Sequence, residues 1–314
     1  MFQIIITSLL PIFLVLGLGA ALKTWEFLPA EFFPKLNRLA FYIGLPALLF
    51  SRIATSPLEG GPALRIFWLI LGVSALVLPI AFLIVKTMKL SRPSQGAFLQ
   101  AGLRGNLAYI GLSVILYTMD GNGMGNGGVE TTAMLVLAPT VPLYNILSVI
   151  ILSGCSDQKH RRPSLVSLGK KIITNPLLIA CLLGLAVAWL QWQVPVAVLR
   201  TLEPLSQMAL PLALLAIGSS LCGGGLNRQA VLPAAIASIL KVGLTPLLGF
   251  FGARMLSLTP EETRMALLFL ACPTAVTGFI MAEQMGADEK LAGNAVVLST
   301  LFSFFSLSAV LVLT

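Results

Sequence analysis

The chain has 314 residues, of which 57% are hydrophobic and only 10% are charged, against about 25% charged residues in soluble domains. This composition cannot supply a water-exposed surface, so it argues against a soluble domain and indicates a polytopic membrane protein. The net charge of +8 does not point to nucleic-acid binding here, because Lys and Arg gather in the cytoplasmic loops of membrane proteins.

Ten apolar stretches are long enough to cross a bilayer, which takes about 20 residues at a rise of about 1.5 Å each. The predicted spans are residues 3–22, 35–54, 64–85, 94–117, 131–153, 172–190, 199–221, 229–254, 263–283 and 290–313. The first span lacks a basic leading segment and a small-residue cleavage motif before Lys23, so we expect a mature helix and not a signal peptide.

The positions of the basic residues predict the orientation. With the N-terminus outside, thirteen Lys and Arg residues fall in cytoplasmic loops and five in outside loops, while Arg104 and Lys241 lie within the membrane. Because basic residues favour the cytoplasmic side, both termini are expected on the opposite, extracytoplasmic side.

The fourth span carries polar and helix-weakening residues at its centre, in the run AGLRGNLAYIG at 101–111. A charge at the bilayer centre costs at least about 2.5–3.5 kcal/mol, so Arg104 should face protein or water. Gly102, Gly105 and Asn106 favour an interrupted helix that lines a site at this depth. The alternative is a kinked helix in which Arg104 only caps the carbonyls of a neighbour.

An internal duplication relates the two halves of the chain. Adding 165 maps Pro11 onto Pro176, Gly19 onto Gly184 and the pair at 45–46 onto that at 210–211; adding 167 maps Pro79 onto Pro246, Pro93 onto Pro260 and Gly111 onto Gly278. Five spans per half place the second copy upside down, as in the inverted repeats of secondary transporters. We therefore predict a first repeat over 1–153, a cytoplasmic linker over 154–171 and an inverted repeat over 172–314.

The ninth span contains the repeat partner of the interrupted segment, the run ACPTAVTGFIM at 271–281. Asn106 aligns with Pro273, and a proline removes an amide donor and clashes with the preceding turn, so this helix should break too. Two broken helices at matching positions predict a binding site, and the N-terminus of a half-helix favours an anion.

Other polar residues within the spans leave several roles open. Lys241, in the eighth span, could be a substrate counter-ion, a snorkelling lysine or half of a buried pair, and Asn145, in the fifth, could belong to the site or bond a neighbouring helix. Aspartate and glutamate are missing from the middle of every span, with Glu130 expected in a loop. This favours an anionic substrate, although a sodium site of carbonyl, Thr and Asn oxygens remains open.

The sequence also indicates what chemistry is not expected. No cluster of His, Cys and carboxylate residues falls within the spans, so neither a metal nor a cofactor is predicted. An intramembrane protease would need a catalytic His or Asp inside the membrane, and the spans have none, so we do not expect an enzyme. A channel or a receptor remains an alternative to a carrier.

Four stretches of the chain resemble the auxin efflux carrier family, the PIN-like carriers, and in particular its small bacterial members. They are RGNLAYIGL (104–112), NPLLIACLLGL (175–185), LPLALLAIGSSL (210–221) and PTAVTGFIMAEQMGADEKLAGNAVVLSTLFSFFSL (273–307). The resemblance covers nearly all of the chain, and the last stretch is the most specific.

The resemblance implies ten helices in two inverted repeats, with helices 4 and 9 broken and crossing at the centre. It implies a scaffold of helices 1, 2, 6 and 7, a transport domain of helices 3–5 and 8–10, a homodimer, and an elevator-like movement of small organic anions across a bacterial inner membrane. An asparagine in the fourth-helix break binds the substrate carboxylate in plant relatives, and Asn106 stands there. The plant relatives have a second asparagine near the ninth-helix break, where this chain has Pro273, Thr274 and Thr277.

These observations together predict a carrier for a small organic carboxylate in the lipid bilayer, with Asn106 donating to the carboxylate alongside backbone amides near Gly105 and Thr274. Arg104 or Lys241 would supply the compensating charge. A sodium- or proton-coupled symporter of the same fold is the alternative. The candidate substrate-binding residues are Asn106, Arg104, Gly105, Tyr109, Asn145, Lys241, Pro273, Thr274 and Thr277.

Overall fold

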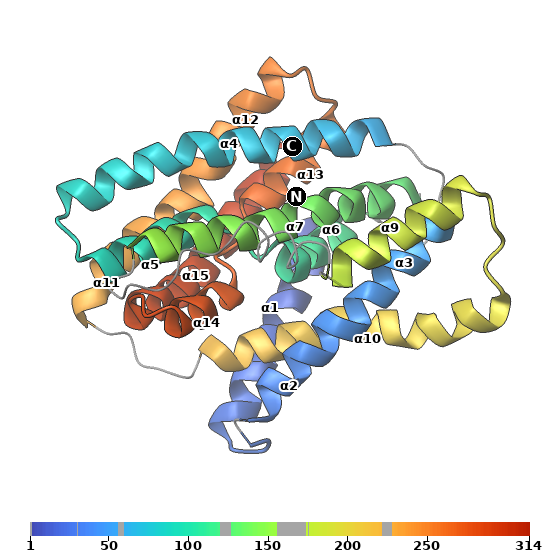
Figure 1. Ribbon diagram of the computed structural model, residues 1–314, viewed down its shortest axis with the longest axis horizontal. Coiled ribbons are helices and arrows are strands. Elements are labelled where there is room, and N and C mark those ends of the chain that lie inside the picture. The colour runs from blue at the N-terminus through green and yellow to red at the C-terminus, as the bar shows by residue number, and fades with distance from the viewer. Residues whose placement is uncertain are drawn as a thin grey trace. The chain divides into compact units, whose positions relative to one another are not determined.

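A computed structural model describes residues 2–29, 31–55, 60–119, 127–155, 174, 176–221 and 228–314, and within these ranges the regular structure is helical (Figure 1). In chain order the elements, with η for a π-helical turn, are α1 (Phe2–Thr24), α2 (Phe32–Leu39), η1 (Ala40–Gly44), α3 (Leu45–Thr55), α4 (Gly60–Thr87), α5 (Arg92–Leu103), η2 (Leu107–Gly111), α6 (Leu112–Met119), α7 (Gly127–Cys155), α9 (Pro176–Trp189), α10 (Val196–Leu221), α11 (Arg228–Ile239), η3 (Leu240–Leu244), α12 (Thr245–Met255), α13 (Pro260–Leu270), α14 (Val276–Gln284) and α15 (Glu289–Leu313).

Helices occupy each of the stretches in which apolar spans were predicted. Five described helices are long and apolar enough to cross a membrane: Gly61–Thr87, Gly128–Cys155, Val196–Ser219, Ala230–Met255 and Glu289–Leu313. Shorter apolar helices cover Leu9–Thr24, Leu107–Met119 and Pro176–Trp189. The protein is therefore a helical multi-pass membrane protein, whereas ten spans in two inverted repeats stay a prediction. The predicted linker at 154–171 lies outside the described residues, apart from Gly154 and Cys155 at the end of α7.

The chain divides into two compact units, which are described separately. The first unit comprises Met1–Leu64, Ala108–Pro142 and Gly169–Gly223, and the second comprises Arg65–Leu107, Leu143–Leu168 and Gly224–Thr314. The long helix α7 contributes its first half to one unit and its second half to the other.

In the first unit, α10 packs along α1, α2 and α3, and α9 packs on α3 (Figure 1). Glycines let α1 and α10 approach until their backbones touch. A Cβ built on Gly19 would overlap the carbonyl of Leu215, and one on Gly218 would overlap that of Leu16. Small residues at such crossings are typical of helix packing in membranes, where close van der Waals contact replaces the hydrophobic effect.

We expect Gly19→Ala and Gly218→Ala each to destabilise the protein by about 1–3 kcal/mol, because the added methyl group has to push two backbones apart. Gly17→Ala is the matched control on α1, since a Cβ there would meet nothing within 4 Å. Thermal unfolding in detergent should show lower midpoints for the first two variants and an unchanged midpoint for the control. Equal midpoints for all three would contradict the close crossing.

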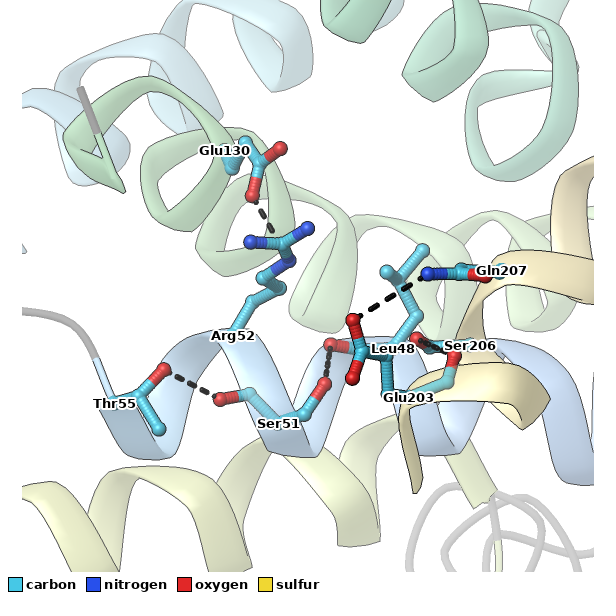
Figure 2. A network of polar contacts seen from close by, with 8 residues as sticks. All are labelled: Leu48, Ser51, Arg52, Thr55, Glu130, Glu203, Ser206 and Gln207. Atoms are coloured by element: carbon cyan, nitrogen blue, oxygen red, sulfur yellow. Dashed lines mark hydrogen bonds and ion pairs between the residues drawn. The ribbon is translucent and has the colours of Figure 1, made fainter. Parts of the chain in front are cut away.

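A polar network in the first unit corrects one prediction (Figure 2). Glu130 belongs to helix α7 and not to a loop, and its carboxylate is buried 3.0 Å from Nε of Arg52 on α3. Nearby, Ser51 and Thr55 donate their hydroxyls back to carbonyls of α3, and on α10 Gln207 donates to the carboxylate of Glu203 (Figure 2). The helix extends past the sequence expectation because Glu130 lies in its first turn, where a carboxylate favours the positive helix end.

The second unit is built around α5, α11, α14 and α15. Small side chains such as Ala234, Ala237 and Ala295 form much of its buried cluster, together with the large ring of Phe98. Every residue of α5 from Gly96 to Leu103 is buried, so this half-helix is surrounded by protein on all sides. The C-terminal end of α5 therefore delivers the residues that follow it into the interior of the unit.

Candidate functional site

The predicted interruption of the fourth span is present. Helix α5 begins at an N-cap, Ser91, whose hydroxyl accepts from the amide of Ser94, and it ends at Leu103. Arg104 has an extended backbone, with φ −89° and ψ 110°, and helical structure resumes only at Leu107. The glycines on either side of Arg104 weaken the helix at this point, as the sequence predicted.

The predicted interruption of the ninth span is present as well. Helix α13 starts with a capping box, in which Thr259 and Glu262 bond each other's backbone amides, and it ends at Leu270. The segment from Ala271 to Ala275 contains Pro273, and α14 begins after it. Since proline cannot donate an amide hydrogen, the helix ladder cannot continue through this segment.

The two interruptions bond to each other within the second unit. The amide of Asn106 donates to the carbonyl of Pro273 at 2.7 Å, and the amide of Ala275 donates to the carbonyl of Arg104 at 3.1 Å. Gly105 and Thr274 face each other in an antiparallel bridge between these bonds. Backbone groups freed by one break are thus satisfied by the other, which meets the requirement that buried amides and carbonyls be paired.

Thr274 fixes this junction with its remaining polar groups. Its hydroxyl donates to the carbonyl of Ala101 at 2.6 Å, and its amide donates to the hydroxyl of Ser299 at 3.0 Å. The sequence had suggested that backbone amides near Thr274 would bind a ligand. Ser299 on α15 already uses that amide, and donation to a substrate by other backbone amides near Thr274 stays a prediction.

The guanidinium of Arg104 lies buried among neutral acceptors. One terminal nitrogen donates to Oδ1 of Asn145 at 2.6 Å and to Oγ1 of Thr277 at 2.7 Å, and the other donates to Sδ of Met281 at 3.0 Å. Arg104 is only 6% exposed and makes no ion pair with any residue in the described ranges. A buried positive charge with no charged partner is a strong attractor for an anion.

The first turn of α14 lies beside this arginine and has backbone amides that are available as hydrogen-bond donors. No side chain caps the helix at Ala275, and the amides of Val276 and Thr277 make no hydrogen bond with the described part of the chain. A helix N-terminus carries about half a positive charge and presents its free amides to an anion. Arg104 contacts Thr277 in this turn, so the helix end and the guanidinium reinforce each other.

Lys241 is the second buried cation of the second unit. It lies in the π-helical turn η3, is only 2% exposed, and donates from Nζ to the carbonyl of Leu270 at 2.6 Å. Thr245 donates to the same carbonyl at 2.8 Å. A snorkelling role is wrong, since the side chain is enclosed, and its partner is the C-terminal end of α13, where the helix dipole is negative. Its aliphatic end packs on the break: a Cβ on Gly105 would lie 3.0 Å from Cε of Lys241.

The structure thus brings most of the predicted residues together in the second unit. They form three groups: Arg104 with Asn145 and Thr277, Gly105 with Lys241, and Asn106 with Pro273 next to Thr274. Asn106 is 5% exposed, and the hydrogen bond described for it is that of its backbone amide. Tyr109 belongs to the first unit, where its hydroxyl is buried without a partner in the described ranges.

Sequence reasoning missed several residues of this region. Met281 and Ser299 bond the junction from α14 and α15, and Gln100 lies buried one turn before Arg104 on α5. Methionine and serine in an apolar span carry no signal of their own, whereas a glutamine in the middle of a span could have been noticed. Where the chain is described, no group of three or more His, Cys, Asp or Glu side chains could hold a metal ion.

A family model described as membrane transport protein matches residues 4–311. The chain belongs to this family. The match confirms the resemblance to the auxin efflux carriers, which are members of it. This membrane transport protein is similar to a protein of Rhizobium meliloti (strain 1021) named "Putative malonate transporter", with 26% identity over 313 residues that cover 97% of this chain and 94% of the relative.

Two archaeal proteins are similar over comparable lengths. An uncharacterized transporter of Methanocaldococcus jannaschii is 23% identical over 287 residues, which cover 90% of this chain and 89% of the relative. An uncharacterized transporter of Methanothermobacter thermautotrophicus is 24% identical over 302 residues, which cover 96% of this chain and 95% of the relative. The similarities extend across both breaks, so the relatives span the region that contains the candidate site.

Proposed function

We propose that this membrane transport protein is a secondary transporter for a small organic carboxylate, which it moves by an elevator-type alternating-access mechanism. The observation that carries the proposal is the buried guanidinium of Arg104, whose hydrogen-bond acceptors in the described ranges are all neutral. Its charge is left for the substrate to compensate. The relative named for malonate supports a small dicarboxylate as the first substrate to test.

In the proposed complex, Arg104 supplies the compensating charge and the free amides of Val276 and Thr277 point to the same carboxylate. Asn106, which is 5% exposed, donates its carboxamide to the substrate. Lys241 contributes at longer range, because the carbonyl of Leu270 already holds its ammonium group. Binding by several preplaced donors selects an anion over a neutral analogue, since a missing charge would leave these donors unpaired.

Two pairs of equivalent residues support the inverted repeat on which the elevator proposal depends. Asn106 and Pro273 are equivalent under the offset of 167, and they bond each other directly. Gly19 and Gly184 are equivalent under the offset of 165; Gly19 on α1 packs on α10, and Gly184 on α9 packs on α3, the equivalent of α10. Equivalent residues making equivalent contacts are expected where two copies are related by a twofold axis.

The remaining parts of the proposal follow the family resemblance. With the helices numbered by the ten predicted spans, not by the α labels, they are a scaffold of helices 1, 2, 6 and 7 and a transport domain of helices 3–5 and 8–10. They also include a homodimer and an inner membrane with both termini outside. In support, α1, α2, α3, α9 and α10 belong to the first unit, and α4 from Arg65 onward, α5 and α11 to α15 belong to the second. The assignment does not account for α6 and the first half of α7, which fall in the first unit.

The decisive experiment is ligand binding followed by transport. Malonate at about 100 times its dissociation constant should stabilise the purified protein by about 2.7 kcal/mol, because it binds the folded state only. Uptake of labelled malonate into proteoliposomes should saturate and show counterflow, with and without sodium or proton gradients. Uptake that requires one gradient would establish the coupled symporter, uptake without saturation would indicate a channel, and no binding of any small carboxylate would refute the proposal.

We expect Asn106→Ala to weaken malonate binding more than about tenfold, because a hydrogen bond to a charged group contributes about 1.5–3 kcal/mol. The backbone bond from Asn106 to Pro273 remains in the variant, so folding should persist. Calorimetric titration of both proteins measures the change. Asn37→Ala, on α2 of the first unit, is the control and should bind as the wild type does; an unchanged affinity in Asn106→Ala would remove this residue from the site.

A further inference from the structure

Gln100 is a buried amide that nothing in the described structure satisfies. It is 2% exposed and lies in the wholly enclosed half of α5. Neither Nε2 nor Oε1 has a hydrogen-bond partner among the described residues. Buried side-chain amides are nearly always paired, so a carboxamide with both ends free is available to bind a polar ligand.

The Gln100 amide lies against the first turn of α14. A Cβ built on Gly278 would be 2.8 Å from Nε2 and 3.5 Å from Cδ of Gln100, so only glycine leaves the amide in its present place. Gly278 follows Val276 and Thr277 directly, and these two residues carry the free amides of the helix end. The unpaired carboxamide is therefore aimed at the same helix N-terminus as Arg104.

Gln100 and Arg104 also lie one turn apart where the chain leaves α5. The amide of Arg104, the first residue after the helix, donates to the carbonyl of Gln100 at 3.0 Å. Arg104 reaches Thr277 and Met281 on α14, and Gln100 reaches Gly278 between them. Two adjacent anchors, one charged and one neutral, thus face one short helix.

We propose that Gln100 is a second substrate anchor, which selects small anions with a second polar head group over simple monocarboxylates. The inference rests on the proposed function and adds a selectivity residue to it. One carboxylate of a dicarboxylate binds Arg104 and the α14 amides, and the second accepts from Nε2 of Gln100. A monocarboxylate of the same size leaves the amide unpaired, which is the condition under which buried polar groups discriminate between ligands.

The test compares malonate with propionate, in which a methyl group replaces the second carboxylate. Dissociation constants are measured by calorimetry on the purified full-length protein. In Gln100→Leu, malonate affinity should fall about tenfold or more while propionate affinity stays within about twofold. Gln95→Leu is the matched control on the same helix, because Gln95 already donates to the carbonyl of Leu90 and should not affect the ratio.

The possible outcomes distinguish a failure of the proposed function from a failure of the role proposed for Gln100. A wild-type protein that binds neither anion refutes the proposed function and this inference with it. Binding of malonate with an unchanged malonate-to-propionate ratio in Gln100→Leu refutes the inference alone. If Gln100→Leu does not fold, Gly278→Ala gives the same decision, because its Cβ displaces the amide and should lower the ratio in the same direction.

Discussion

Replacing Arg104 by methionine is expected to weaken malonate binding by at least about 30-fold and to abolish measurable transport. Removing one partner of a buried, hydrogen-bonded charge pair costs about 2–5 kcal/mol, and each 1.4 kcal/mol is about a factor of ten in affinity. The described residues offer Arg104 no carboxylate, so the substrate loses its main compensating charge in this variant. Calorimetry and uptake into proteoliposomes measure the two effects.

The same substitution should leave the free energy of unfolding nearly unchanged. The variant leaves Oδ1 of Asn145 and Oγ1 of Thr277 without their donor, at about 1–3 kcal/mol each. Against this, it removes a charge that costs at least about 2.5–3.5 kcal/mol at the centre of a bilayer. A large loss of binding without a large loss of stability is typical of a residue kept for function.

Two companion variants sharpen the test. Arg254→Met removes a guanidinium of the same unit that lies over the ring of Phe250, and it should bind malonate normally. Arg104→Lys keeps the charge but cannot reach both acceptors with one ammonium group, so its affinity should be intermediate. If Arg104→Met bound malonate as strongly as the wild type does, Arg104 would not bind the substrate. Its role would then be structural, holding the end of α5 to the neighbouring helices.

Much of the helical framework was predictable from the sequence because its signals are local. Runs of apolar residues mark the helices, and the glycines around Arg104 and the proline at 273 mark the two breaks. The offset that pairs Asn106 with Pro273 also predicted which segments would correspond. The apolar runs and the breaks depend on residues close together in the chain, whereas the offset depends on comparing the two halves.

The sequence could not predict hydrogen bonds between residues that lie far apart along the chain. The hydrogen bond between Arg104 and Thr277 spans 173 residues, and that between Thr274 and Ala101 spans the same number. No periodicity relates such positions. The sequence also gives no sign that the amide of Thr274 donates to the hydroxyl of Ser299. The π-helical turn that contains Lys241 was not predicted either, because no residue pattern in Leu240–Leu244 marks a π-helical turn.

The two buried cations were equivalent in the sequence and are not equivalent in the structure. Lys241 donates to Leu270, the last residue of α13, so the negative end of that helix compensates part of its charge. Arg104 instead lies beside the start of α14, whose positive end adds to its own charge. The structure therefore favours Arg104 for direct contact with an anion and Lys241 for closing the end of a broken helix.

Asn145→Asp tests whether Arg104 needs neutral hydrogen-bond acceptors in order to bind an anion. It is the second variant for which we expect a large effect on malonate affinity. The new carboxylate would lie where Oδ1 is now, 2.6 Å from a guanidinium nitrogen, and would form a charge-assisted pair about twice as strong as a neutral hydrogen bond. Arg104 would then be compensated within the protein. We expect malonate affinity to fall at least about 30-fold, since the substrate loses about 2–5 kcal/mol of charge pairing, while the unfolding midpoint rises.

A double variant tests whether Asn145→Asp acts by pairing with Arg104 or by destabilising the folded protein. If the aspartate acts by pairing with Arg104, then Arg104→Met together with Asn145→Asp leaves a buried carboxylate unpaired and should be less stable than either single variant, by about 3–5 kcal/mol. Thr277→Val is the neutral control: it removes an acceptor without adding charge, so it should reduce affinity only modestly. If Asn145→Asp bound malonate as the wild type does, the charge of Arg104 would not be what the substrate compensates, and the anion site would have to be sought away from α14.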